Sequence, residues 1–434
     1  MSKLALLGGK PVFESAMQKY RSLGSVEEAA VIDVIRSGCL SGFYGSWEDG
    51  FLGGPKIQEF EAVWAKRFDV SHVVSVNSNT SGLIAAMGAV GVGPGDEVIM
   101  PCTTMSATAM APIFYGGIPV FSDIDPDTFC IDIDSVRENL TEKTKAVIAV
   151  NLFGQAAPLG ELFQLCKEHD IYLIEDNAQA PLATEHGKYC GTIGHIGIFS
   201  LNYHKHIHTG EGGMCCTNDG VLAQRLQMIR NHAEAVVGPA EVEDLTNMVG
   251  LNLRLSELSA AVGLVQLEDA EKHISRRQHL AESLSEGCKD LEGITTPVVR
   301  EGCRHVSYCW VIRYDSSITG VSRQAFVEAL QAEGFPCFPG YIRPLYMLPV
   351  FQQRIAIGRN GYPFTMTKRE YAEGLCPVAE RLHADEIIGF ETCAYDVSDQ
   401  DTPLLIEAIR KVHDASGDLA EWEKKPVTTA NLFS

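Results

Sequence analysis

The sequence lacks any apolar run of the roughly 20 residues needed to cross a bilayer. Its start also lacks the features of a signal peptide, because the apolar stretch at residues 4–7 is short and ends at once in Gly8 and Gly9. Neither an internal repeat nor a low-complexity segment is present. We therefore expect a globular protein that stays in the cytoplasm and has no membrane partner.

Basic residues are few: 35 lysines and arginines stand against 56 aspartates and glutamates, a net charge of −21. A nucleic-acid partner needs a basic surface, so this balance argues against one. A small phosphorylated ligand in a local pocket stays compatible with the charge.

The thirteen cysteines are odd in number and scattered, and none forms a Cys-x-x-Cys pair. Cys215 and Cys216 are adjacent, which suits neither a zinc knuckle nor a redox loop. We expect reduced, mostly buried thiols.

A chain of 434 residues exceeds one ordinary compact domain, and 45% hydrophobic residues are enough for a proper core. We predict four parts. They are an N-terminal arm with a helix and a loop (1–54), a large domain (55–276), a smaller α/β domain (277–416) and a loosely held tail (417–434).

Short apolar runs alternate with helical patterns in the large domain, which predicts a mostly parallel sheet covered by helices on both faces. Ligands of such sheets bind beyond the carboxyl ends of the strands. The predicted strands are 72–76, 97–100, 118–121, 146–150 and 171–174.

Other segments predict helices or loops outside this sheet. Ser25 with Glu28 three residues later is typical of a capping box that opens a helix. The segment 41–55 is rich in glycine and aromatics, which is typical of a loop over a ligand and equally of a surface loop. Helices are predicted at 25–36, 81–90, 254–276, 323–333 and 402–413, and a further strand at 307–314.

Three strand ends carry candidate chemistry. The first, NSNTS at residues 77–81, precedes a helix whose N–H groups and hydroxyls could bind phosphate, although Ser and Thr are also ordinary caps. The second holds Asp176, a carboxylate that needs a cationic partner such as a pyridinium nitrogen; a solvated aspartate or a magnesium ligand is the alternative. The third holds Lys205, whose amine becomes a nucleophile if it is desolvated and is otherwise an ordinary surface lysine.

In their order and spacing these segments resemble the DegT/StrS family of sugar aminotransferases, within the aspartate-aminotransferase fold type. The similarity covers nearly the whole chain, and it is specific because many motifs occur in order. Residues 4–12 (LALLGGKPV) resemble the start of the cyclitol and antibiotic-biosynthesis branch. Further matching segments are 60–61, 93–98, 123–125, 250–256 (GLNLRLS), 343–346 (RPLY) and 376–381 (CPVAER).

The resemblance implies a pyridoxal 5′-phosphate (PLP) enzyme of fold type I, with the PLP-binding site in the large domain. Lys205 would be the Schiff-base lysine and acid/base, and Asp176 would pair with the pyridine nitrogen. The resemblance also implies a homodimer with sites shared across the interface. The implied cofactor contacts are Asn79, Thr80, Met105, Gln179 and Ser200, with Asn252 from the neighbouring subunit; the implied substrate contacts are Tyr44, His206, Arg254 and Tyr341.

Two positions depart from the family pattern. Asn79 stands where the family usually has glycine, and asparagine tolerates left-handed backbone angles better than most residues. Met105 stands where an aromatic usually stacks on the cofactor, and its polarizable sulfur can pack on a ring.

The histidines His204, His206 and His208 alternate along the chain, which would suit a metal site on one face of a strand. No carboxylate or cysteine set accompanies them, so we predict no metal and expect some of them to line the substrate entrance.

The predicted function is therefore amino transfer from glutamate or glutamine to the keto group of a nucleotide-linked sugar. Amination of a keto-cyclitol is the main alternative. Sugar dehydration would need histidine at the position of Lys205, and a PLP-binding regulator without turnover is disfavoured by the intact site residues.

Overall fold

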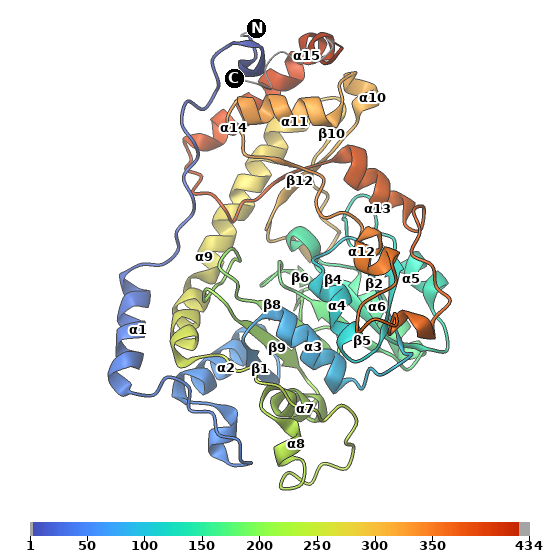
Figure 1. Cartoon of the computed structure of the whole chain (residues 1–434). Helices are drawn as coiled ribbons and strands as arrows, with labels where there is room; N and C mark the ends of the chain where they lie inside the picture. The colour runs from blue at the N-terminus through green and yellow to red at the C-terminus, as the bar shows by residue number, and fades with distance from the viewer. Residues whose placement is uncertain (1–2, 425–434) are drawn as a thin grey trace.

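The computed structural model describes residues 3–424, in which two β-sheets of unequal size are linked by one long helix, α9 (Glu257–Cys288) (Figure 1). The larger sheet has seven strands in the order β1-β9-β8-β5-β4-β2-β3. All of them run parallel except β9, which is antiparallel to both of its neighbours. The strands are β1 (His72–Val76), β2 (Glu97–Pro101), β3 (Ile118–Ser122), β4 (Thr144–Val150), β5 (Tyr172–Asp176), β8 (Ile196–Ser200) and β9 (Gly213–Thr217).

The five strands predicted for this sheet are confirmed, and so is its mostly parallel character. Strand β9 was missed because its short run directly follows the glycines of the Lys205 segment and carries no alternation. In the sheet it lies between β1 and β8 and is hydrogen-bonded to both.

Helices cover both faces of the larger sheet. Gly82 of α3 lies against Ile198 and Cys215, because a Cβ there would come within 2.6 Å and 3.0 Å of their side chains. Trp64 of α2 packs edge-on against Phe199, which points to the opposite face. The helices around this sheet are α2 (Pro55–Phe68), α3 (Asn79–Ala89), α4 (Ala107–Phe114), α5 (Ile133–Asn139), α6 (Leu159–Glu168), α7 (Gly220–Arg230) and α8 (Ala233–Val236). Helix α1 (Ser25–Ser37) packs against α9 instead.

The smaller sheet has four antiparallel strands in the order β10-β12-β14-β13, with its own apolar core. Its strands are β10 (Ile294–Thr295), β12 (Trp310–Tyr314), β13 (Phe338–Pro339) and β14 (Ile387–Phe390). The helices after α9 are α10 (Ser316–Thr319), α11 (Arg323–Ala332), α12 (Pro349–Gln352), α13 (Pro377–Arg381), α14 (Asp401–Asp414) and α15 (Ser416–Glu423).

Short elements complete the fold. A third sheet joins β11 (Cys303–Arg304), β6 (Thr184–Glu185) and β7 (Lys188–Tyr189). The single turns are η1 (Ala5–Leu7), η2 (Asp49–Leu52), η3 (Leu152–Gly154), η4 (Leu345–Met347), η5 (Phe364–Met366) and the π-helical η6 (Leu382–Glu386).

The two ends of the described chain meet at the smaller sheet, at the top of Figure 1. Leu4 is buried in the core of that sheet, and the Glu333 carboxylate accepts the N–H groups of Ala5 and Val12. The Nζ of Lys411 donates to the same carboxylate at 2.7 Å. The start of the N-terminal arm is therefore anchored to the smaller sheet's core by Leu4 and by these hydrogen bonds.

The prediction of a loosely held tail from residue 417 is wrong for its first part. Residues 416–423 form α15, and Leu419 of this helix is fully buried. The apolar positions of this short helix are too few to give a period, so only tertiary packing identifies it. The predicted tail beyond residue 424 lies outside the described residues.

Two predicted helix boundaries also differ. The start of α1 is capped by Glu27, which accepts the N–H of Gly24 at 2.8 Å, and not by the pair Ser25 and Glu28. Helix α9 continues twelve residues past the predicted end at 276, across the boundary drawn between the two domains. The domain division itself stays a prediction.

All thirteen cysteines are free and most are buried, which confirms the expectation of reduced thiols. Within residues 3–424, no helix is both long and apolar enough to cross a membrane.

Candidate active site

The carboxyl ends of β5 and β8 and the turn after β1 converge at one edge of the larger sheet. Asp176 ends β5 and lies in register with Ile198 of β8. Its side chain therefore points to the same face as Ile198, the face covered by α3. The fold thus brings Asp176 and the start of α3 together.

The Asp176 carboxylate is buried and has three hydrogen-bond donors. Thr108 Oγ1 donates at 3.0 Å, Asn79 Nδ2 at 3.3 Å and the N–H of Ala178 at 3.3 Å. Burial raises the pKa of Asp176, and these donors and the nearby Lys205 act in the opposite direction. Thr108, in α4 after β2, was missed by the sequence reading. The rule that ligands bind at the carboxyl ends of strands could have found it.

The N-terminus of α3 is capped within the chain but keeps two free amides. Ser78 Oγ accepts the N–H of Ser81 at 3.1 Å, and the first helical amide bonded to a carbonyl is that of Gly82. Among the described residues, the N–H groups of Asn79 and Thr80 have no hydrogen-bond acceptor. A ligand with acceptor oxygens, such as a phosphate, can take both amides.

The backbone explanation for Asn79 is corrected by the structure. Asn79 is the first residue of α3 and needs no left-handed angle, since it does not have a positive φ. Its side chain instead spans the site, with Nδ2 on Asp176 and a buried Oδ1 that has no partner within the described residues. Gly213 of β9 permits this turn, because a Cβ there would come within 2.8 Å of the Ser78 backbone.

Lys205 lies in the loop after β8, and its amine lies near the Asp176 carboxylate. Burial lowers the pKa of the Lys205 amine, and the Asp176 carboxylate acts in the opposite direction. The amine lies 3.3 Å from the hydroxyl of Tyr308 and 4.5 Å from the centre of its ring. Tyr308 lies 103 residues further along the chain, just before strand β12 of the smaller sheet. Nothing in the sequence predicts its contact with Lys205.

Gln179 and Tyr341 form one wall of the pocket. Gln179 Nε2 donates to the Tyr341 hydroxyl at 3.0 Å, and its Oε1 accepts the N–H of Phe153 at 2.6 Å. The ring of Phe153 packs edge-on against that of Tyr341. The structure therefore brings together two residues that were predicted separately.

Tyr44, Asn252 and Arg254 gather in a second group around Asn231. Asn231 donates to the carbonyl of Tyr44 at 2.8 Å and accepts from Arg254 Nε at 2.9 Å, while Asn252 is exposed and bridges to Asn231 through the backbone. The Tyr44 ring is 63% exposed. Within one chain this group makes no hydrogen bond to Lys205 or Asp176 among the described residues.

Two other predicted cofactor contacts, Ser200 and Met105, make no hydrogen bond to Lys205 among the described residues. Ser200, at the end of β8, accepts the N–H of Asn202 through its hydroxyl at 3.3 Å. Met105 precedes α4 and is 58% exposed, so its side chain is free to cover a ligand.

The expectation that His206 lines a substrate entrance does not agree with the structure. His206 is 1% exposed and its Nδ1 accepts from Arg277 at 2.9 Å. The His206 ring packs edge-on against that of Tyr308, whose hydroxyl in turn contacts the Lys205 amine. His208 bonds the hydroxyl of Ser22 at 2.6 Å, and His204 packs on Tyr203.

One cluster within residues 3–424 has metal-ligand spacing, and it excludes these histidines. Its donors are Cys102, Asp123 and Cys376, all within 4.8 Å of one another. The Asp123 oxygens already accept the N–H groups of Val378 and Ala379 at 2.9 Å, which caps α13. This carboxylate therefore has a structural task.

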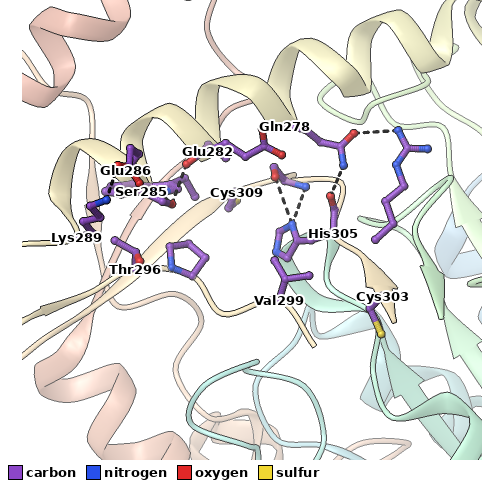
Figure 2. Close-up of a pocket in the computed structure, with 15 residues that line it drawn as sticks. Gln278, Glu282, Ser285, Glu286, Lys289, Thr296, Val299, Cys303, His305 and Cys309 are labelled. Atoms are coloured by element: carbon purple, nitrogen blue, oxygen red, sulfur yellow. Dashed lines mark hydrogen bonds and ion pairs between the residues drawn. The ribbon is translucent and has the colours of Figure 1, made fainter. Parts of the chain in front are cut away.

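A cavity of about 510 Å³ lies between α9 and the segment that leads into β12 (Figure 2). Its lining includes Ser307 and Cys309 but not Tyr308, the residue between them. Polar residues on opposite walls of the cavity are hydrogen-bonded: Gln278 donates to the carbonyl of His305 at 2.7 Å, as a dashed line in Figure 2 marks. Neither Lys205 nor Asp176 is among the residues that line this cavity, so it is distinct from their site.

The pocket suits PLP in its donor set. Asp176 offers a buried carboxylate to a cationic ring nitrogen, Lys205 offers a desolvated amine to an aldehyde, and the start of α3 offers amides to a phosphate. The unpartnered Oδ1 of Asn79 leaves one further acceptor in the pocket.

Comparisons with known proteins agree with this assignment. The sequence profile of the DegT/DnrJ/EryC1/StrS aminotransferase family matches residues 46–387. The chain is 32% identical over 429 residues to the L-glutamine:2-deoxy-scyllo-inosose aminotransferase of Streptomyces kanamyceticus, covering 93% of this chain and 97% of that protein.

Solved structures are similar over almost the full length. The aminotransferase TlmJ from Streptoalloteichus hindustanus is 30% identical with a TM-score of 0.76, covering 92% of this chain and 99% of that one. DesI, crystallised with its TDP-sugar product, is 26% identical with a TM-score of 0.81, covering 97% and 99%. The fold expected from the sequence, that of the type I PLP aminotransferases, is confirmed. This chain belongs to the DegT/DnrJ/EryC1/StrS aminotransferase family.

Proposed function

We propose that this protein uses PLP at Lys205 to transfer an amino group from glutamate or glutamine to the ring ketone of a nucleotide-linked sugar. PLP, when bound, withdraws electrons from the carbon that carries the transferred nitrogen and so acidifies its hydrogen. The observation that carries the proposal is the meeting of a desolvated amine, Lys205, and a buried carboxylate, Asp176, in one pocket.

Each side chain of the pocket has a task in this proposal. Lys205 forms the covalent bond to the cofactor and later accepts and returns a proton. Asp176 keeps the cofactor's ring nitrogen protonated, and Thr108 orients the Asp176 carboxylate through its hydrogen bond. The amides of Asn79 and Thr80 bind the phosphate together with the hydroxyl of Ser200.

Gln179 and Met105 would contact the cofactor ring. Gln179 is held in place by the N–H of Phe153 and by its hydrogen bond to the Tyr341 hydroxyl, and this would fix the orientation of its amide toward the ring. Met105 would pack its thioether on the face of the ring.

The experiment is a titration of the purified protein with PLP, followed by glutamate and, separately, glutamine. We expect a visible absorbance band on adding PLP and its loss on adding the correct donor. Lys205→Ala should abolish the band, whereas the exposed Lys188→Ala should leave it unchanged. A protein that forms no band, or whose band responds to neither donor, contradicts the proposal.

The acceptor divides into two candidates. The similarity to DesI, whose structure holds a TDP-sugar, favours a nucleotide-linked keto-sugar. The similarity to the 2-deoxy-scyllo-inosose aminotransferase, over 93% of this chain, favours a keto-cyclitol. Protein in the aminated form, mixed with each ketone in turn, regains its visible band only with the true acceptor class.

We further propose that two chains complete each site, with Tyr44, Asn252 and Arg254 supplied by the neighbouring subunit. Support comes from the exposure of Tyr44 and Asn252 and from the absence of a hydrogen bond between either residue and Lys205 within residues 3–424. Mixing two inactive variants, Lys205→Ala and Arg254→Ala, should restore about a quarter of the activity, because half of the dimers then hold one intact site. If each chain makes its own complete site, mixing restores nothing.

A further inference from the structure

Tyr308 is the hydrogen-bond partner of the Lys205 amine among the described residues, with 3.3 Å between Oη and Nζ. The amine also lies 4.5 Å from the centre of the tyrosine ring. Tyr308 is 5% exposed, so its hydroxyl meets the amine in a place largely closed to water. A buried hydroxyl needs a partner, and here the partner is the group that would react.

The backbone of Tyr308 is held on both sides. Thr392 Oγ1 donates to the carbonyl of Tyr308 at 3.0 Å, and the N–H of Cys309 donates to the carbonyl of Phe153 at 3.3 Å. Gly154 allows the close approach, because a Cβ there would come within 2.9 Å of the nitrogens of Ser307 and Tyr308. These contacts fix the backbone position from which the Tyr308 side chain extends toward Lys205.

The ring of Tyr308 is held as well. His206 packs edge-on against it at 5.9 Å between ring centres, and Arg277 donates to His206 Nδ1 at 2.9 Å. Because arginine only donates, Nδ1 is the acceptor and His206 is neutral with its proton on Nε2. A fixed charge on α9 thus holds a neutral imidazole against the tyrosine.

We propose that Tyr308 is the positioning residue for Lys205, holding the amine with its hydroxyl and ring while that amine accepts and returns the proton of amino transfer. This inference rests on the proposed function of Lys205. Tyr308 itself neither gains nor loses a proton, because burial raises its pKa well above neutral pH. Its oxygen can accept from the ammonium form of Lys205, and its O–H can donate to the amine form.

The ammonium form gains more from this contact, since hydrogen bonds to charged groups are the stronger ones. Removing the hydroxyl should therefore lower the pKa of the Lys205 amine. The other ionisable or charged groups around the amine and the tyrosine are Asp176, His204, His206, Arg277, Cys309, Tyr341, Glu391 and Cys393. All of them stay in place when Tyr308 is changed.

The test is Tyr308→Phe, which keeps the ring and removes the hydroxyl. In the protein without cofactor, the rate at which an amine-reactive reagent labels Lys205 is measured against pH by mass spectrometry. We expect the midpoint to fall by about one pH unit, the shift that loss of one charge-assisted hydrogen bond implies. In the PLP-loaded protein, the rate of the reaction with donor should fall roughly 10-fold with KM little changed.

Tyr314→Phe is the matched control. Tyr314 is also a buried tyrosine in the same stretch of chain, and its hydroxyl bonds the carbonyl of Val321 at 3.0 Å, away from Lys205. This variant should leave both the labelling midpoint and the donor reaction unchanged. Melting temperatures of both variants report any loss of stability.

A Tyr308→Phe protein with the wild-type midpoint and donor rate overturns the inference while leaving the proposed function intact. Loss of the proposed function would show differently, as a wild-type protein that fails to react with either donor. If Tyr308→Phe does not fold, Tyr308→Leu removes hydroxyl and ring together, and its midpoint should lie lower still. An unchanged midpoint there overturns the inference equally.

Discussion

Glu175 and Asp176 are adjacent acids at the end of one strand, and they point to opposite faces of the larger sheet. Both are buried, and burial raises the pKa of both carboxyls. Glu175 accepts three backbone N–H groups, those of Gly191, Ile193 and Gly194, at 2.5–2.8 Å. Asp176 accepts from two flexible side chains and one amide at 3.0–3.3 Å.

The difference separates a structural acid from a functional one. Backbone amides on a tight turn cannot rearrange, so Glu175 ties the loop after β7 to the sheet. The longer bonds of Asp176 leave room for a stronger partner, and the amine of Lys205 already lies near it. Burial alone therefore does not identify an active-site carboxylate; the nature of its donors does.

The distinction between a functional Asp176 and a structural Glu175 is tested most strongly by replacing each carboxylate with an amide. Asp176→Asn should lower turnover at least about 100-fold, because the charge that holds the cofactor's ring nitrogen protonated is lost. The folded state should be little affected, since the change removes a buried charge. Steady-state rates and melting curves of the purified variant check both statements. Near-normal turnover would assign Asp176 a structural role like that of Glu175.

Glu175→Gln should behave in the opposite way. An amide can accept from fewer of the three N–H groups, and its own NH₂ group then faces donors, so the free energy of unfolding should fall by about 1–3 kcal/mol. Turnover per folded molecule should stay within about threefold of wild type. Urea denaturation with activity measured on the folded fraction separates the two effects. A large loss of turnover at full stability would count against the distinction.

Glu333 extends the comparison to the smaller sheet. Its buried carboxylate accepts two backbone amides of the N-terminal arm and the ammonium of Lys411. Glu333→Gln removes the charge and leaves Lys411 without its anion, which should cost about 2 kcal/mol. Proteolysis should then cut near residues 5–12 sooner than in wild type. Unchanged proteolysis would mean that the burial of Leu4 alone anchors the arm.

The smallest expected effect concerns His305, which lines the cavity between α9 and the segment that leads into β12. Burial lowers the pKa of His305 from 6.5 to about 4, so the folded protein holds it neutral. Its contribution to stability is present above pH 6.5 and is lost as the pH falls toward 4. His305→Gln should flatten the decline of the melting temperature over this range. Parallel pH profiles for the two proteins would show that His305 titrates alike in the folded and unfolded chain.

The sequence reading was accurate where local pattern decides structure. The five buried strands of the larger sheet were placed within two residues, because continuous apolar runs bounded by turns leave few alternatives. The prediction of helix ends is less accurate: the cap of α1 lies one residue before the predicted pair, and α15 occupies part of the predicted tail. Such features depend on a single side chain or on a small packed face, which carries little periodic signal.

The site residues show the same division. Asp176 and Lys205 stand out in the sequence because each follows a buried strand, and the structure brings them together. Thr108 and Tyr308, which contact those two side chains, come from segments 68 and 103 residues away from them. His206 was read as a surface residue of the entrance, yet packing buries it beneath Tyr308.

By itself the sequence determined the alternation of strands and helices, the edge where chemistry must lie and the two charged groups at its centre. These follow from short-range rules, because hydrophobic period and strand ends are written in consecutive residues. Only the tertiary structure decided what surrounds those groups. The partners of a buried amine or carboxylate are chosen by long-range packing, and packing depends on shapes that no local pattern encodes.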